Sequence, residues 1–258
     1  MRSGLTRSIA ALFEDAHQLG SLFGRTLYYL LHGKREKGSV ARMMFEVGNK
    51  SLLFMCVTMG FIGAIIAFQT GLQAKKLVPD FSMIGATYLK LLVRDLAASL
   101  GALPLATRVG AGIAAELGSM VVTEQVDALR MCAADPVDYL VVPRFVASVV
   151  MGTVVLIIGG FVAYLAGMAV AQMVFDVNPH TFTNLSMVTT GDLTLGLFKC
   201  ITYGGAIAIV SSQRGLATFG GSEGVGHATT EAVVGSCFAI IVLNLIISTL
   251  GYFFVPAL

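Results

Sequence analysis

Three charged side chains lie in segments that are otherwise apolar enough to cross a membrane. Arg94 and Asp95 are adjacent, and Lys199 lies in a separate segment. An ionisable group inside a membrane-spanning helix is costly to bury, so these residues are the first candidates for function. Successive residues of a helix point about 100° apart, so Arg94 and Asp95 each need another partner. Lys199 is a candidate partner for Asp95. Alternatively, Lys90 and Arg94 simply extend to the membrane surface.

A second group of charged residues lies between two apolar segments, over residues 104–144. Its acidic members are Glu116, Glu124, Asp127, Asp135 and Asp138. Val122, Val126, Leu129 and Ala133 fall on one face at helical spacing. The pattern predicts a short amphipathic helix. This helix is either a docking element for a partner protein or a solvated loop helix without a partner.

The composition restricts the class of protein to which the chain can belong. Of its 258 residues, 56% are apolar and 12% are charged, and soluble domains carry about twice that share of charge. The net charge of +2 is too small for a surface that follows a nucleic-acid backbone. These values exclude a disordered chain, a typical cytosolic enzyme and a nucleic-acid binder. They leave an all-α polytopic membrane protein.

No residue pattern indicates a metal, a disulfide or a nucleotide site. The four cysteines and four histidines are scattered, without the spacing of metal ligands. Residues 221–227 have the glycine spacing of a phosphate-binding loop, but His227 stands where Lys is needed and Glu223 would repel phosphate. We expect residues 214–231 to form a flexible Gly-rich loop. The chain is predicted to be no enzyme and to hold no cofactor of its own, so energy must come from a partner or a gradient.

Five segments are predicted to span the membrane. A bilayer core needs about 20 apolar residues in a helix, and three uncharged runs of 24, 31 and 27 residues meet that length. Two further segments carry the charges described above. The five predicted spans are 51–74, about 81–103, 145–175, about 190–213 and 232–258.

The distribution of basic residues predicts the orientation. Eight of the 17 Lys and Arg residues lie in the first 50 positions, which places the N-terminus in the cytoplasm under the positive-inside rule. Residues 104–144 and 214–231 then face the cytoplasm, whereas 176–189 and the C-terminus face the periplasm. Lys75 and Lys76, in a predicted short hairpin at 75–80, do not fit this orientation.

Residues 1–45 are predicted to form a separate region that precedes the transmembrane domain of residues 46–258. An apolar stripe recurs there at helical spacing and is flanked by charges, which is typical of a helix lying in the membrane interface. The alternative is an ordinary amphipathic helix packed on the rest of the protein. The stripe consists of Leu5, Ile9, Leu12, Phe13, Ala16, Leu19, Phe23, Leu27 and Leu30.

Small residues at four-residue spacing mark the first predicted span. Such rows let two helices approach closely, so we expect a tight helix contact there. The rows are Gly60 with Ala64, and Gly63 with Ala67 and Gly71.

Residues 92–144 resemble the signature region of the MlaE/YrbE permease family. The matching features are Arg94–Asp95, the R-x-G of Arg108–Gly110, the run AELGSMVVTEQVDAL at 115–129, Asp135–Pro136 and Pro143–Arg144. The resemblance extends over about residues 45–258 and includes FQTGLQ at 68–73 and the Lys199 segment. The chain departs from the family pattern after Arg94, where the family often has Glu followed by Gly-Pro and this chain has Asp95-Leu96-Ala97-Ala98.

The resemblance implies the permease subunit of an ABC transporter that moves phospholipids between the inner and outer membranes of Gram-negative bacteria. It implies a homodimer in the inner membrane, and we expect the small-residue rows of the first span to lie near its two-fold axis. It also implies a separate MlaF-like ATPase that binds ATP and Mg. A MlaB-like STAS protein would bind that ATPase, and a MlaD-like hexamer of MCE domains would lie on the periplasmic side. The segment at about 105–144 would hold the coupling helix, with Ala115, Glu116, Leu117, Met120, Glu124 and Asp127 as the docking residues.

The lipid pocket would lie at the dimer centre, and we expect Arg94 and Lys199 to line or support a polar region beneath it, with Asp95 balancing their charge. A purely structural ion-pair network is the alternative. A second function, a secondary transporter that uses these charges as a proton or ion relay, stays open from the residues alone. Inverted repeats with paired broken helices, which are typical of such transporters, are not visible in the sequence.

Overall fold

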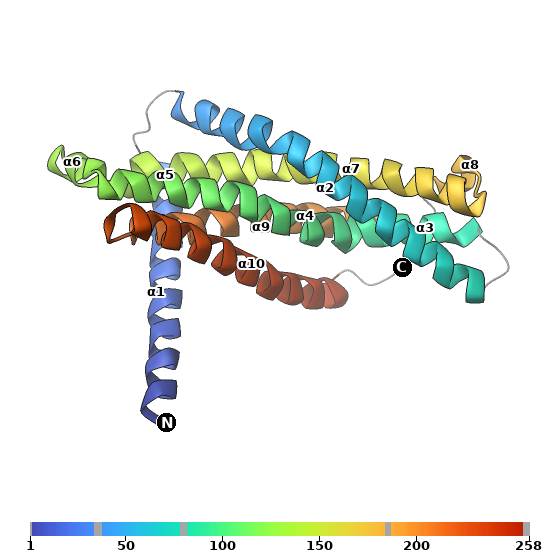
Figure 1. The fold of residues 1–258 in the computed structure, drawn as a ribbon, viewed down its shortest axis with the longest axis horizontal. Helices are drawn as coiled ribbons and strands as arrows, with labels where there is room; N and C mark the ends of the chain where they lie inside the picture. The colour runs from blue at the N-terminus through green and yellow to red at the C-terminus, as the bar shows by residue number, and fades with distance from the viewer. Residues whose placement is uncertain (1, 34–37, 78–81, 184–186, 255–258) are drawn as a thin grey trace.

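The computed structural model describes residues 2–33, 38–77, 82–183 and 187–254, and its described elements are all helices (Figure 1). Five of them are long and apolar enough to cross a membrane: Ser39–Gln73, Gly85–Val122, Val137–Phe175, Thr190–Leu216 and Gly221–Phe253. The predicted all-α, multi-pass architecture is therefore confirmed. In order, the elements are α1 (Arg2–His32), α2 (Ser39–Leu77), α3 (Ser82–Leu91), η1 (Leu92–Leu96), α4 (Ala97–Leu105), η2 (Ala106–Gly110), α5 (Ala111–Val122), α6 (Gln125–Met131), η3 (Val137–Val141), α7 (Val142–Phe175), α8 (Pro179–Phe182), α9 (Thr190–Leu216) and α10 (Gly221–Phe254).

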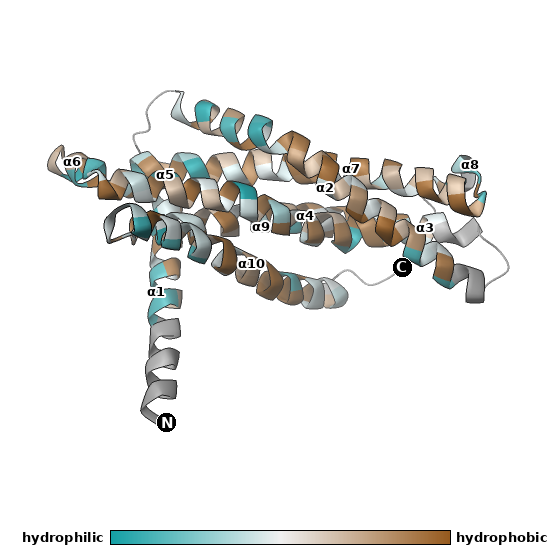
Figure 2. Cartoon of the chain, viewed as in Figure 1, coloured by the Kyte–Doolittle hydropathy of each residue, from teal (hydrophilic) through white to brown (hydrophobic). Residues whose placement is uncertain are grey.

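The membrane-spanning segments pack side by side, and each runs opposite to the one before it in the chain. The first and third are therefore parallel. Gly63 of α2 lies against Ala163 of α7, and Gly71 lies against Phe175, so these two helices run parallel. Helix α9 runs antiparallel to α10, because Gly251 lies against Leu195 while Ser211 lies beside Ser236. Figure 2 shows hydrophobic residues over the middle of these helices, with hydrophilic residues at α6 and at the starts of α2 and α10. The connections at 123–136 and 217–220 lie together at the end of the bundle that carries α6 (Figure 1), and we call this end the α6 end.

The second membrane-spanning helix is longer than the sequence predicts. The prediction ended it near residue 103, just before Pro104, which has no backbone N–H to donate within a helix. Instead the chain continues through two wider π-helical turns, η1 and η2, and remains helical to Val122. Ile113, Ala114, Leu117 and Gly118 are buried. At 1.5 Å per residue the 38-residue run is about 57 Å long, so its end lies outside a hydrocarbon core of about 30 Å.

The small-residue row of α2 makes the close contact that was predicted, but within one chain. A Cβ atom added at Gly63 would lie 2.6 Å from the Cα of Ala163 on α7, and one added at Gly71 would lie 2.6 Å from the Cζ atom of Phe175. Ala67 is 4% exposed. This face of α2 is thus covered by α7 and is not available to a second copy. Gly60 and Ala64, at the edge of the row, are half-buried.

The prediction of a flexible loop at 214–231 is wrong. Helix α9 continues to Leu216 and α10 begins at Gly221, so that only residues 217–220 connect them. Gly220 and Gly221 have positive φ angles of 87° and 75°, which glycine adopts without strain. Gly215 belongs to α9, whereas Gly224 and Gly226 lie in the first turns of α10, where Glu231 pairs with His227 four residues earlier. The predicted hairpin at 75–80 lies largely outside the described residues.

The N-terminal helix α1 stands nearly at right angles to the long axis of the bundle, near its α6 end (Figure 1). One face packs on the bundle through Leu22, which is buried, and through Gln18, which accepts a hydrogen bond of 3.1 Å from Gln213. The apolar residues Phe23, Leu27 and Leu31 lie off that face and are 48–76% exposed. The alternative of a helix packed on the rest of the protein is therefore observed, and a position in the membrane interface stays a prediction, which the uncovered apolar face favours. The boundary expected at residue 45 falls inside α2, which begins at Ser39.

Candidate functional site

Lys199 is the centre of a polar network inside the bundle. Its side chain is 1% exposed and forms an ion pair with Asp95 of η1, as the sequence suggested. The Lys199 ammonium also donates hydrogen bonds to the Asn244 side-chain oxygen at 2.9 Å and to the Ser248 hydroxyl at 2.7 Å. Tyr203 donates to the same Asn244 oxygen. Because an ammonium has three N–H donors, all of them are used.

Arg94 has a separate partner that the sequence analysis missed. Its guanidinium forms an ion pair of 3.0 Å with Asp192, whose side chain is 1% exposed. Asp192 also caps the start of α9, where it accepts hydrogen bonds from the Thr189 hydroxyl and the Thr189 backbone N–H. The T-x-x-D spacing of 189–192 is a sequence signal for such a cap and could have identified Asp192.

The two ion pairs connect the second membrane-spanning helix to α9 at two levels. Asp192 and Lys199 are seven residues apart, which places them two turns apart on one face of α9. The wider turn of η1 contains both Arg94 and Asp95, and such turns are frequent at functional sites. Lys199 and Asp192 are sealed from the surroundings, whereas 25% of the Arg94 side chain and 39% of the Asp95 side chain remain exposed. Arg94 and Asp95 are therefore the members of the network that a bound molecule can reach.

An apolar cavity of about 520 Å³ adjoins this network between η1, α4, α7 and α9. Val93 and Cys200, the sequence neighbours of Arg94 and Lys199, line it, as do Leu156 and Phe161 of α7. Arg94, Asp95 and Lys199 do not line it themselves. Its lining is almost wholly apolar, which suits an alkyl chain rather than a polar solute.

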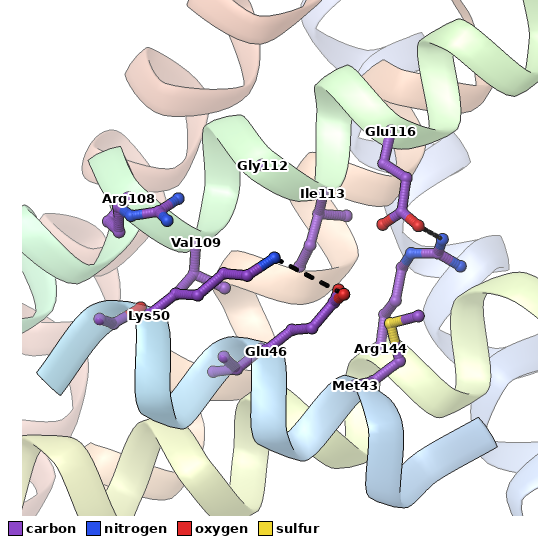
Figure 3. Close-up of a pocket in the computed structure, with 11 residues that line it drawn as sticks. Met43, Glu46, Lys50, Arg108, Val109, Gly112, Ile113, Glu116 and Arg144 are labelled. Atoms are coloured by element: carbon purple, nitrogen blue, oxygen red, sulfur yellow. Dashed lines mark ion pairs between the residues drawn. The ribbon is translucent and has the colours of Figure 1, made fainter. Parts of the chain in front are cut away.

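The residues expected to dock an ATPase divide into two groups. Ala115, Glu116, Leu117 and Met120 belong to α5, the end of the long helix, and Leu117 is fully buried. Glu116 forms an ion pair of 2.9 Å with the buried Arg144 of α7 (Figure 3). The prediction that its charge is free for a partner protein therefore does not hold within this chain.

Glu124 and Asp127 lie at the exposed tip of the bundle. Helix α5 ends at Val122, and Glu124 takes a left-handed conformation with φ of 60°, which turns the chain into the short helix α6 (Figure 1). Asp127 pairs with Arg130 on the surface. The amphipathic helix is thus shorter than predicted, and we call residues 122–132 the α6 tip. Sequence reasoning missed Met131, which is 89% exposed there.

A polar contact ties α1 to the segment that follows α6. The Asp135 carboxylate accepts hydrogen bonds from Arg25 and Tyr29 of α1 and from the backbone N–H of Val137. Partial burial raises the pKa of Asp135, but these three donors outweigh it and hold the pKa below its ordinary value. The hydrogen bond that Tyr29 donates to Asp135 raises the pKa of the Tyr29 hydroxyl. Asp15 of α1 likewise pairs with Arg214 at the end of α9.

Comparison with known proteins identifies the family. The sequence model of the family described as Permease MlaE matches residues 40–250. The chain belongs to the MlaE permease family. It is 35% identical over 253 residues to a probable ABC transporter permease protein of Synechocystis, with 96% of this chain and 95% of that protein covered. A probable ABC transporter permease protein of Rickettsia prowazekii is 34% identical, with 83% of each chain covered.

A third relative comes from a plant. The protein Trigalactosyldiacylglycerol 1, chloroplastic, of Arabidopsis thaliana is 30% identical over 232 residues, covering 88% of this chain and 65% of that protein. Family membership favours a permease subunit of an ABC transporter and does not favour the secondary transporter considered from the charges alone.

Proposed function

We propose that this chain is the membrane-spanning subunit of a transporter that moves phospholipids between the inner and outer membranes, and that a separate ATPase drives it. The name of the Arabidopsis relative contains a glycerolipid, which supports a lipid cargo. The apolar cavity of about 520 Å³ beside the Arg94–Asp95 turn supports the same assignment. Alkyl chains fit the apolar lining, and the exposed part of the Arg94 guanidinium is a donor for a phosphate oxygen.

The observation that carries the proposal is the α6 tip, which extends beyond the packed part of the bundle (Figure 1). It combines the apolar side chains of Val122 and Met131 with the charges of Asp127 and Arg130, all exposed. Exposed apolar side chains next to charged ones, at a tip that no other described element covers, are available for contact with a partner protein. The α6 tip is therefore the proposed docking element for a MlaF-like ATPase, which binds ATP and Mg itself.

The proposed assembly follows the resemblance described above. Two copies of the chain form a homodimer in the bacterial inner membrane, and a MlaB-like STAS protein binds the ATPase. A MlaD-like hexamer of MCE domains lies on the periplasmic side. In the proposed orientation the α6 end and α1 face the cytoplasm, and the C-terminus faces the periplasm. Helix α1 then lies along the membrane surface with Phe23, Leu27 and Leu31 toward the lipid.

Substitution at the α6 tip tests this proposal. Met131→Asp places a charge in the proposed contact and should reduce recovery of the ATPase with the tagged permease at least tenfold, because burying an unpaired charge at an interface is costly. Met173→Asp is the matched control, since Met173 is 84% exposed near the opposite end of the bundle. Equal recovery of the ATPase with Met131→Asp and the wild type would place the docking surface elsewhere.

A further inference from the structure

A charged cavity lies at the α6 end, separate from the network around Lys199. It has a volume of about 330 Å³ and lies between the start of α2, η2 with α5, and the start of α7. Figure 3 shows Lys50 and Glu46 reaching from α2 into the space between Arg108 and the Arg144–Glu116 pair. Three cations and two carboxylates therefore line one space, with a formal excess of one positive charge.

The cations of this cavity are not all satisfied by the protein. Lys50 pairs with Glu46 at 3.6 Å, and Arg144 pairs with Glu116 at 2.9 Å. Arg108 makes no ion pair with any residue that the structure describes. The Arg144 side chain is 5% exposed, and its Nε atom has no hydrogen-bond partner within the described parts of the chain. A buried donor without an acceptor is costly, so the cavity lacks an anionic acceptor.

An apolar stripe continues from the cavity along the same face of α2. Lys50, Phe54, Val57 and Phe61 follow one another at spacings of four, three and four residues, which keeps them on one side of a helix. Phe54, Val57 and Phe61 are 42%, 50% and 68% exposed. The distance from Lys50 to Phe61 along the helix is about 16 Å, roughly half of a hydrocarbon core of about 30 Å. The stripe continues through Ile65, Phe68 and Leu72, and its part next to the cavity, from Lys50 to Phe61, has the length of one leaflet. A cationic cavity at the head of such a stripe matches a phospholipid rather than a free anion.

We propose that this cavity binds the phosphate of an anionic phospholipid, with Arg108 and Arg144 as the principal donors and the acyl chains lying along Phe54, Val57 and Phe61. Guanidinium groups suit this role because they bind phosphate oxygens through paired N–H donors. The site lies at the opposite end of the bundle from the Arg94–Asp95 turn. It does not depend on the proposed transport function, since binding requires neither an ATPase nor turnover.

Lipid binding to the purified, delipidated full chain tests the proposal. The measurement is the apparent Kd for phosphatidylglycerol by native mass spectrometry, with phosphatidylcholine as the comparison lipid. Arg108→Gln removes one charge-assisted contact and should weaken phosphatidylglycerol binding about tenfold, which corresponds to about 1.4 kcal/mol. Arg42→Gln is the matched control, because Arg42 is an exposed cation of α2, the helix that supplies Lys50, and does not line the cavity.

A variant of opposite sign separates a binding role from a folding defect. Glu46→Gln removes a carboxylate from the cavity and should tighten phosphatidylglycerol binding, which a damaged fold would not do. Unchanged binding in Arg108→Gln, or an equal loss in Arg42→Gln, would overturn the proposal. Displacement of the lipid by millimolar inorganic phosphate would overturn the lipid assignment and show a site for soluble anions. Equal affinity for phosphatidylcholine would refute the preference for an anionic headgroup.

Discussion

Replacing Lys199 by methionine should destabilise the protein chiefly by leaving Asp95 without its partner. Lys199 is 1% exposed and uses its three donors on Asp95, Asn244 and Ser248. Removing one member of a buried ion pair costs about 3–5 kcal/mol. Because 39% of the Asp95 side chain is exposed, water can partly solvate the remaining carboxylate, which favours about 3 kcal/mol. For a chain of this size, each kcal/mol lowers the melting temperature by about 2–4 °C, so we expect a fall of about 6–12 °C.

The double variant Lys199→Met with Asp95→Asn supplies the control. It removes both charges, and Ser248 still donates to Asn244 at 3.2 Å, so most of the lost melting temperature should return. The chain has no Trp, but Cys200 is 5% exposed, so a thiol-reactive dye reports unfolding once the exposed Cys132 and the half-buried Cys56 and Cys237 are replaced by alanine in every variant compared. A double variant as unstable as Lys199→Met would refute the view that an unpaired Asp95 causes the loss. So would a single variant with the melting temperature of the wild type.

Two further predictions concern packing and pH. Gly63→Ala forces a Cβ atom to within 2.6 Å of the Ala163 backbone and should cost about 1–3 kcal/mol, whereas Gly60→Ala, whose nearest neighbour is Val162 at 3.5 Å, should be tolerated. Equal melting temperatures of the two variants in detergent would contradict the α2–α7 contact. The lowered pKa of Asp135 means that its contribution to stability is complete above about pH 4 and declines as the pH falls through the folded-state pKa. The difference in melting temperature between the wild type and Asp135→Asn should therefore be constant from pH 5 to 7 and shrink at lower pH, and a difference that grows on acidification would contradict this assignment.

The general architecture could be predicted because apolar length alone determines a membrane span. Uncharged runs such as 145–175 have no soluble alternative, and α7 follows this run closely. The extension of the second span through Pro104 could not be predicted from local rules. In a bundle, neighbouring helices and a π-helical turn can accommodate a proline that would end a soluble helix. The Gly-rich start of α10 was mistaken for a loop for the same reason, since glycine is common in membrane helices.

The candidate site was predicted in part. Pairing of Asp95 with Lys199 followed from the cost of leaving either charge alone in the membrane. The ion pair of Glu116 could not be predicted because its partner, Arg144, lies 28 positions away, and only the folded chain brings the two together. The same limit applies to Asn244 and Ser248, which resemble ordinary polar residues of an apolar run until α10 packs on Lys199.

ATP-dependent lipid transfer is the most direct test of the central claim. The full chain is co-reconstituted into vesicles with the ABC ATPase that co-purifies with it, and transfer of a fluorescent phospholipid to an acceptor is followed with and without ATP. The proposal predicts transfer that requires ATP and is lost with Met131→Asp but not with Met173→Asp. Transfer at the same rate without ATP, or ATP-driven movement of a water-soluble solute in place of phospholipid, would contradict it.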